Sequence, residues 1–370
     1  MNRLIRLYEE FDQSPWLDNL RRGYLTSGQL LTLRDQGIRG LTSNPTIFQK
    51  AIEGAADYDE QFRVLALDEH PTIADYWTMV LHDIAGAAEI LEPVYDESGG
   101  IDGYVSVEVD PGLAHDEAGT EEAARLLHER IARRNVMVKI PATAEGLGPI
   151  RAMIAEGRNT NVTLIFSLDR YREVINAYLD GLEAYAAQEG TELGTVSSVA
   201  SFFISRVDTE VDRRLEQIGS PEALALRGKA AIAQGKLAYR LFTEMFSGER
   251  WEALAARGAK VQRPLWASTS TKNEAYPDTM YVDDLIGPFT VNTMPDATIE
   301  AFNDHGTLER TVDRGVDEAD AVLQSITDIG VDLDDVADVL EREGVASFQK
   351  SFQGLIDALD AKVSELRAEQ

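Results

Sequence analysis

A single lysine stands inside a predicted strand. The chain has eight lysines, and seven of them lie in helical or loop sequence, whereas Lys139 lies in the strand-like run V-M-V-K-I-P. Pro141 cannot donate to a strand ladder, so Lys139 lies near the carboxyl end of its strand. Partial desolvation at such a position lowers the pKa of a lysine, and the neutral amine attacks carbonyl groups. The position therefore favours Schiff-base chemistry.

Two carboxylates lie on one face of the preceding predicted strand. Glu108 and Asp110 are two residues apart, about 7 Å along a strand, and this spacing is compatible with acid/base hydrolysis of a glycosidic bond. We rank that interpretation below the Schiff base because it leaves Lys139 without a role. A structural alternative also stands, in which a Lys139–Glu108 ion pair only fills the interior, because buried ion pairs are not by themselves evidence of function.

Histidine and cysteine offer no competing chemistry. The histidines at positions 70, 82, 115, 128 and 305 include no pair at i, i+3 or i, i+4 spacing, and we expect them on helix surfaces or in loops. The chain has no cysteine, which excludes thiolate sites and disulfides and favours the reducing cytoplasm. It contains no G-x-G-x-x-G or P-loop either. We therefore expect neither a metal nor a nucleotide cofactor.

Eight short apolar runs alternate with helical patterns, as in a sheet built from β/α units. The runs are residues 16–20, 38–42, 103–109, 136–140, 161–166, 196–201, 264–268 and 289–292. Successive side chains of a strand point to opposite faces, and in the third, fourth and fifth runs the apolar residues share one face. Helices would cover the outside of a closed sheet, so we expect Glu108, Lys139, Asn161 and Thr163 inside it. Eight runs predict a (β/α)8 barrel of the TIM type.

Helices account for the rest of the chain. We expect them at residues 121–134, 169–188, 221–246 and 295–303, with further inserted helices in the long gaps 42–103 and 201–264. Three more, at residues 318–327, 333–343 and 347–367, should wrap the barrel. We predict a single domain over residues 1–370, with barrel strands at about 16–292 and C-terminal helices at about 293–370.

The chain is strongly acidic, with a formal net charge of −29. That charge repels phosphate backbones, so we expect no nucleic-acid partner. No apolar window approaches the roughly 20 residues that a bilayer requires, so no membrane span is expected. Charged residues interrupt the first segment, which is unlike a signal peptide and should stay attached. An acidic excess is also compatible with a salt-rich cytoplasm.

Six segments, in order on successive predicted strands, resemble those of the transaldolase family. They are GLTSNPTIF at 40–48, VSVEVDP at 105–111, NVMVKIPAT at 135–143, NTNVTLIFS at 159–167, SVASFFISRVD at 198–208 and RPLWAST at 263–269. The resemblance covers almost the whole chain. The chain length and the segments SPWLDNL and WASTSTK are similar to a bacterial, longer-chain branch of that family.

The resemblance implies a cofactor-free (β/α)8 barrel that acts on sugar phosphates. Such an enzyme transfers a dihydroxyacetone unit from sedoheptulose 7-phosphate to glyceraldehyde 3-phosphate and yields erythrose 4-phosphate and fructose 6-phosphate. Lys139 matches the Schiff-base lysine, Asp18 matches the acid/base aspartate, and Glu108 matches the glutamate that passes protons together with Thr163 and a water. The implied substrate-binding residues are Thr42, Asn44, Asn161, Ser201, Phe203, Arg206 and Ser268. A homo-oligomer is compatible with the sequence.

The chain departs from the family at the seventh strand, where many members read A-S-F-R. Here Ser268 is followed by T-S-T-K, so we predict that Lys272 reaches back as the second phosphate cation beside Arg206. For Lys272 the local alternative is a solvated loop lysine. For Arg206 it is an arginine that pairs with Asp208 or Glu210. The competing functions are a Schiff-base aldolase on fructose 6-phosphate, which needs no acceptor, and an inactive barrel that serves as a binding protein.

Overall fold

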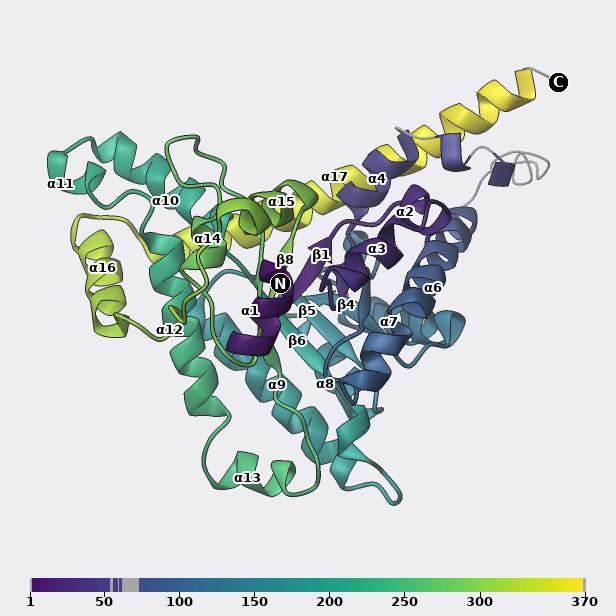
Figure 1. Ribbon diagram of the computed structural model, residues 1–370, viewed down its shortest axis with the longest axis horizontal. Coiled ribbons are helices and arrows are strands. Elements are labelled where there is room, and N and C mark those ends of the chain that lie inside the picture. Colours follow the sequence, from purple (N-terminus) through teal and green to yellow (C-terminus); the bar gives the residue numbers. More distant parts are fainter. Residues whose placement is uncertain (1, 54–55, 59, 62–72, 369–370) are drawn as a thin grey trace.

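Eight parallel strands close into a barrel in the computed structural model, which describes residues 2–53, 56–58, 60–61 and 73–368 (Figure 1). The strands are β1 Gln13–Asp18, β2 Leu41–Thr42, β3 Val105–Glu108, β4 Val136–Pro141, β5 Thr160–Ile165, β6 Ser198–Phe203, β7 Arg263–Ala267 and β8 Thr290–Met294. Neighbours pair in chain order and β1 pairs with β8, so the sheet has no free edge. The predicted (β/α)8 barrel is confirmed, and each predicted run overlaps one strand.

The boundaries of the first two strands differ from the prediction. β1 begins at Gln13 rather than at Trp16, because Gln13, Ser14 and Pro15 pair with β8. These three residues carry no apolar alternation that would mark them as strand. β2 has only two residues, Leu41 and Thr42, although the predicted run was longer.

Polar side chains occupy the interior between β3 and β6. Register pairs Glu108 with Lys139 and Lys139 with Asn161 across three neighbouring strands, so the three side chains share the inner face. The predicted inward set is therefore confirmed. Leu164 departs from the regular alternation that was expected to place the apolar residues of this strand on the outer face. Its φ is +60°, and the β5–β6 register shifts between Val162 and Ile165.

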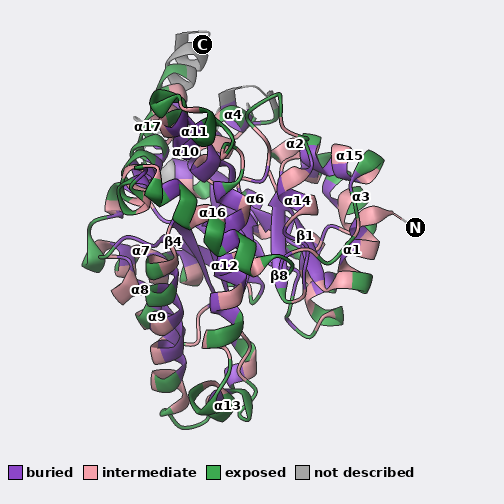
Figure 2. Ribbon diagram, turned by 90° about the vertical axis from the view of Figure 1, so that its left-hand side faces the viewer, coloured by how far each residue is buried: buried purple, intermediate pink, exposed green. Residues whose placement is uncertain are grey.

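Helices cover the barrel, with their exposed residues on the outer faces (Figure 2). They are α1 Arg3–Phe11, α2 Arg22–Thr26, α3 Gln29–Asp35, α4 Pro45–Glu53, α6 Ile73–Glu97, α7 Glu117–Ile131, α8 Leu147–Ala155, α9 Leu168–Ala186, α10 Ser205–Ile218, α11 Pro221–Leu224, α12 Ala230–Met245, α13 Glu249–Ala255, α14 Met280–Asp283, α15 Asp296–His305, α16 Val316–Asp328 and α17 Leu333–Ala368, with 3-10 turns η1 Ala56–Tyr58, η2 Pro111–Leu113 and η3 Leu193–Thr195. Both long gaps contain inserted helices as predicted, although residues 62–72 of the first gap lie outside the described part.

The prediction was wrong about where helices are interrupted in two segments. The segment 221–246 is not one helix, because Gly228 adopts φ +70° between α11 and α12 and its N–H donates to the Asp212 carboxylate. Conversely, the predicted helices 333–343 and 347–367 form the single helix α17. Gly344 lies between the two predicted helices, and it allows close packing, since a Cβ there would lie 2.9 Å from the Leu164 side chain.

A buried ion cluster lies at the amino end of the barrel. The Asp102 carboxylate is fully buried, and it accepts from Arg39 at 2.7 Å, from Arg263 at 3.0 Å and from Ser14 at 2.7 Å. Burial acts to raise the pKa of Asp102, but the guanidinium groups of Arg263 and Arg39 lower it below its ordinary value. These charged groups are buried as pairs, and they link the strands and loops at the amino end of the barrel.

Within the described residues, no helix is long and apolar enough to cross a membrane. The same part of the chain contains no group of three or more His, Asp or Glu side chains that could hold a metal ion. His82, His115 and His305 are exposed as expected and His128 is half-buried on α7, whereas His70 lies outside the described residues.

Candidate active site

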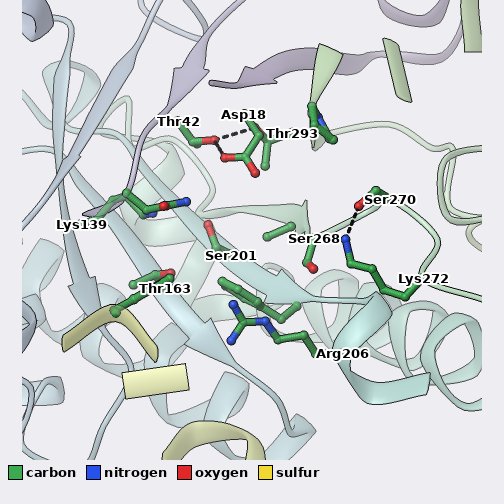
Figure 3. Close-up of a pocket in the computed structure, with 15 residues that line it drawn as sticks. Asp18, Thr42, Lys139, Thr163, Ser201, Arg206, Ser268, Ser270, Lys272 and Thr293 are labelled. Atoms are coloured by element: carbon green, nitrogen blue, oxygen red, sulfur yellow. Dashed lines mark hydrogen bonds between the residues drawn. The ribbon is translucent and has the colours of Figure 1, made fainter. Parts of the chain in front are cut away.

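A pocket of about 210 Å³ lies at the carboxyl ends of the strands (Figure 3). Barrel enzymes carry their catalytic groups at this end. The lining residues are Asp18, Thr42, Asn44, Lys139, Thr163, Ser201, Phe203, Arg206, Ala267, Ser268, Ser270, Lys272, Thr293, Pro295 and Phe348. Of the predicted site residues, only Glu108 and Asn161 are missing from this lining. Each of them contacts a residue that does line the pocket.

Lys139 lies on the inner wall and is only 5% exposed. Its Nζ donates to the Ser43 carbonyl oxygen at 3.0 Å and to Glu108 Oε2 at 3.1 Å. Burial raises the pKa of Glu108, although the Lys139 ammonium opposes this effect. The Glu108 carboxylate is thus able to take a proton from the amine more readily than an exposed glutamate would.

Asp18 stands at the end of β1 and faces the same space. Thr42 Oγ1 donates to Asp18 Oδ1 at 2.7 Å and lies 2.7 Å from Thr293 Oγ1 (Figure 3). Burial raises the pKa of Asp18, and the hydrogen bond from Thr42 works against that rise. The Asp18 carboxylate is therefore held in the pocket by the Thr42 hydroxyl.

The other polar side chains of the site differ in whether they already have hydrogen-bond partners within the protein. The Asn161 amide donates to Ser106 Oγ at 3.0 Å and its oxygen accepts from Ser201 Oγ at 2.7 Å. Asn44 Oδ1 accepts from the N–H of Ile47 at 3.0 Å. Thr163 Oγ1, by contrast, is buried without a hydrogen-bond partner among the described residues, which leaves it available to water or a ligand.

Two cations lie across the pocket from Lys139 (Figure 3). The Arg206 guanidinium carbon is 5.2 Å from the Phe203 ring centroid and 5.8 Å from that of Phe348. Lys272 is exposed but lines the pocket, and its Nζ donates to Ser270 Oγ at 2.6 Å, so its role as the second phosphate cation stays a prediction. Ser268, with φ +57°, brings its Oγ to 2.9 Å from Ser205 Oγ.

The local alternative for Arg206 is wrong. Glu210 pairs with Arg213 and Arg214, both at 2.7 Å. Asp208 accepts from Tyr281 Oη at 2.7 Å and from a backbone N–H. Arg206 itself makes no hydrogen bond or ion pair with the described residues. Burial lowers its pKa, but an arginine stays protonated. Its guanidinium is a free donor group for an anion.

Asp110 does not join Glu108 as a working carboxylate pair. Its side chain accepts from the N–H of Gly112 at 2.7 Å and caps η2. This geometry removes the basis of the glycosidase-like interpretation.

Sequence reasoning missed five lining residues: Ala267, Ser270, Thr293, Pro295 and Phe348. Thr293 could have been found, because it lies on the inner face of β8 in the run T-V-N-T-M. Phe348 has no local signal. It belongs to α17, far along the chain from any strand.

The fold and the pocket define a class: (β/α)8 barrels with one buried lysine, two nearby carboxyls and two cations at the end of the barrel where barrel chemistry takes place. The chain belongs to the transaldolase/fructose-6-phosphate aldolase family, whose model matches residues 15–359. It is 52% identical over 346 residues to a protein of Parafrankia sp. (strain EAN1pec) named transaldolase, covering 93% of this chain and 94% of that one. It is 48% identical over 359 residues to the transaldolase of Acidothermus cellulolyticus, covering 96% of each chain.

Proposed function

We propose that the protein is a transaldolase that works through a Schiff base on Lys139. It would take a dihydroxyacetone unit from sedoheptulose 7-phosphate and give it to glyceraldehyde 3-phosphate, leaving erythrose 4-phosphate and forming fructose 6-phosphate. The observation that carries the proposal is the pairing of a buried Lys139 Nζ with Glu108 at 3.1 Å, because Lys139 lines the same pocket as Asp18. The full-length similarity to named transaldolases supports the same activity.

In the first half-reaction, the Lys139 ammonium gives a proton to Glu108 and the neutral amine attacks the C2 carbonyl of the ketose. The carbinolamine loses its oxygen as water with protons relayed by Glu108. The Thr163 hydroxyl, which has no hydrogen-bond partner in the part of the chain that the structure describes, supports a role in holding the relaying water. Asp18 then takes the proton of the C4 hydroxyl, the C3–C4 bond breaks, and its electron pair moves into the iminium to form an enamine. The aldose phosphate leaves.

In the second half-reaction, the enamine carbon attacks the aldehyde of the acceptor and Asp18 returns its proton to the new hydroxyl. Hydrolysis of the imine then frees the product and restores Lys139. The iminium is the electron sink in both directions, so the chemistry needs neither a metal nor an organic cofactor. Thr42, Asn44, Asn161 and Ser201 would hold the hydroxyls of the three-carbon unit.

The phosphate would bind at the cationic side of the pocket. Arg206 offers unpaired N–H donors, and Ser268 and Lys272 lie at the same wall. Charge-assisted bonds from such groups are the usual means of holding a phosphate. A net charge of −29 makes a local cationic pocket necessary for anionic substrates.

The test is a product analysis with and without an acceptor. Incubation with fructose 6-phosphate and erythrose 4-phosphate should yield sedoheptulose 7-phosphate and glyceraldehyde 3-phosphate in equal amounts. Fructose 6-phosphate alone should yield almost no free dihydroxyacetone. Rapid release of dihydroxyacetone would instead indicate the aldolase, and no conversion in either reaction would indicate a binding protein.

The cellular setting belongs to the same proposal. We infer an enzyme of the non-oxidative pentose phosphate pathway in the cytoplasm, with sugar phosphates as its partners and no role in nucleic-acid binding. The absence of cysteine and the strongly negative charge support this setting. Assembly into a homo-oligomer remains a prediction that sedimentation can test.

A further inference from the structure

A second cavity lies at the amino end of the barrel, opposite the lysine pocket. Its volume is about 380 Å³, against about 210 Å³ for the active site. It contains Ser198 and Arg263, the first residues of β6 and β7, and Met137 near the start of β4. The active site takes later residues of the same three strands, Lys139, Ser201 and Ala267. In Figures 1 and 2, α13, which supplies Trp251, lies far from α10 and α17.

Apolar side chains form most of the walls of this cavity. They are Tyr8, Ile101, Met137, Val199, Trp251, Ala259, Val261 and Phe289. An apolar cavity of roughly 300–1,000 Å³ with a few polar groups is typical of small-molecule sites. The hydroxyl groups of a sugar phosphate would find few hydrogen-bond partners on these apolar walls. The cavity is therefore suited to a more apolar class of ligand.

Phe289 at the rim is unusual in two respects. Its side chain is 56% exposed, and its backbone adopts φ +59° just before β8. A positive φ is strained for a bulky residue, and an exposed aromatic ring adds little to the core in return. The backbone N–H donates to Asp12 Oδ2 at 3.2 Å, which fixes the loop. This combination points to a contact that the folded chain itself does not supply.

Lys260 supplies the cationic group of the cavity. Its Nζ donates to the Gly100 carbonyl oxygen at 2.7 Å and lies 3.4 Å from Ser197 Oγ. Among the described residues no carboxylate pairs with it, and burial lowers its pKa to about 8. The other cation, Arg263, is already neutralised by Asp102 at 3.0 Å, and the carboxylate that lines the cavity, Asp12, accepts from the Phe289 N–H. An anion placed at Lys260 would supply the missing counter-charge.

We propose that this cavity binds a small amphipathic anion, with its apolar body against Trp251 and Phe289 and its anionic group at Lys260 Nζ. Such a ligand matches the volume of the cavity, its apolar walls, the strained exposed ring and a lysine that has no carboxylate partner among the described residues. It does not depend on the reaction at Lys139. The site is separate from the catalytic pocket, so the two can be tested independently.

Titration of the full chain with 8-anilino-1-naphthalenesulfonate tests the site. We expect one dye per chain, with excitation energy transferred from tryptophan. Lys260→Met should weaken binding about tenfold, and Phe289→Ser should weaken it several-fold. The matched controls are Lys350→Met, which removes an exposed lysine, and Leu126→Ser, which removes an exposed apolar side chain. Both controls and Lys139→Arg should bind the dye as the parent chain does. Absence of a stoichiometric site, or equal effects of variants and controls, would overturn the proposal.

Competition with the bound dye identifies the ligand class. Octanoate should displace it, whereas octanol at the same concentration should displace it at least tenfold less well. Equal displacement by both would show that Lys260 does not recognise an anion. Displacement by fructose 6-phosphate would place the dye in the catalytic pocket and would also contradict the proposal.

Discussion

At the scale of single residues, burial and hydrogen-bond partners set the pKa values of the two carboxyls near Lys139. Lys139 and Glu108 share one hydrogen bond at 3.1 Å, and burial holds the pKa of Glu108 above its ordinary value. Burial also raises the pKa of Asp18, but the hydrogen-bond partner of Asp18 is the Thr42 hydroxyl rather than a cation. The two carboxyls therefore have different neighbours, which suits them to different proton transfers.

Replacing Asp18 with asparagine separates the two proton transfers. Asp18→Asn should still form the imine with fructose 6-phosphate but should not cleave the C3–C4 bond, because an amide cannot take the C4 hydroxyl proton. Borohydride reduction followed by intact mass should reveal a six-carbon adduct. Glu108→Gln, as the comparison, should slow adduct formation itself. An Asp18→Asn protein with no adduct would mean that Asp18 acts earlier or supports the fold.

Lys272 offers a test of the cationic wall. Lys272→Ala should raise the Michaelis constant for glyceraldehyde 3-phosphate about tenfold, since a hydrogen bond to a charged group contributes about 1.5 kcal/mol or more. Use of unphosphorylated glyceraldehyde should stay nearly unchanged. Steady-state kinetics with the two acceptors measures the difference. An equal loss with both acceptors, or no change with either, would leave Arg206 as the sole phosphate cation.

At the scale of elements, α17 connects distant parts of the chain with the pocket. Its Gly344 packs on Leu164 of β5, and Phe348, one turn later, stands over Arg206. Arg206 therefore lies between the Phe203 and Phe348 rings, with centroids at 5.2 and 5.8 Å. Aromatic faces attract a guanidinium and hold it without occupying its N–H donors.

Phe348 and Phe352 form a matched pair on α17, because both are buried and four residues apart. Phe352 instead packs edge-on against Tyr76 at 5.2 Å. Phe348→Leu should raise the Michaelis constant for the phosphorylated acceptor about fivefold, for the loss of about 1 kcal/mol of cation–π attraction. Phe348→Tyr, which keeps the ring, should restore the parent value. If Phe352→Leu had the same kinetic effect, α17 would act through general packing and not through Arg206.

The elements that the sequence predicts well are those with short-range periodicity. Two-residue alternation in 105–109 and 136–140 correctly separated inward Glu108 and Lys139 from the outward valines. The same reasoning could not anticipate Leu164, whose positive φ reflects packing under α17. The expected gap between residues 343 and 347 was wrong for the same reason, since Gly344 in that gap packs against a strand some 180 residues away in sequence. Phe348 in the pocket follows only from tertiary structure. The inward-facing catalytic candidates were therefore accessible from strand parity, whereas Asp18, Arg206 and the other binding candidates came from family resemblance.

For the whole molecule, barrel closure separates two ends with different chemistry. The carboxyl end holds the lysine pocket with its free Arg206, while the amino end holds the paired Asp102 cluster and the second cavity. On the outer helices, described carboxylates often pair with arginines, as Glu183 does with Arg250 at 2.7 Å. Such exposed pairs contribute little to stability.

Acid should destabilise the fold in part through His128. Burial lowers its pKa to about 4, whereas an unfolded histidine has a pKa of about 6.5. Between these pH values the unfolded chain binds a proton that the folded chain does not, so stability falls as the pH drops from about 6.5 toward about 4. At pH 5 this amounts to about 2 kcal/mol.

Urea unfolding at pH 7.5 and pH 5 measures this contribution. His128→Gln should lose about 2 kcal/mol less than the parent chain on acidification. His115→Gln, which changes an exposed histidine, should lose as much as the parent. Equal losses in all three chains would assign the acid sensitivity to other groups.

The most direct test of the central claim is to trap the covalent intermediate. The parent chain is incubated with fructose 6-phosphate, reduced with borohydride and analysed by intact mass and peptide mapping. We expect a reduced three-carbon adduct on the peptide that contains Lys139, and none on Lys139→Arg, which should fold but have no activity because arginine stays protonated. No adduct on the parent chain, or an adduct that maps to another lysine or persists in Lys139→Arg, would contradict the account.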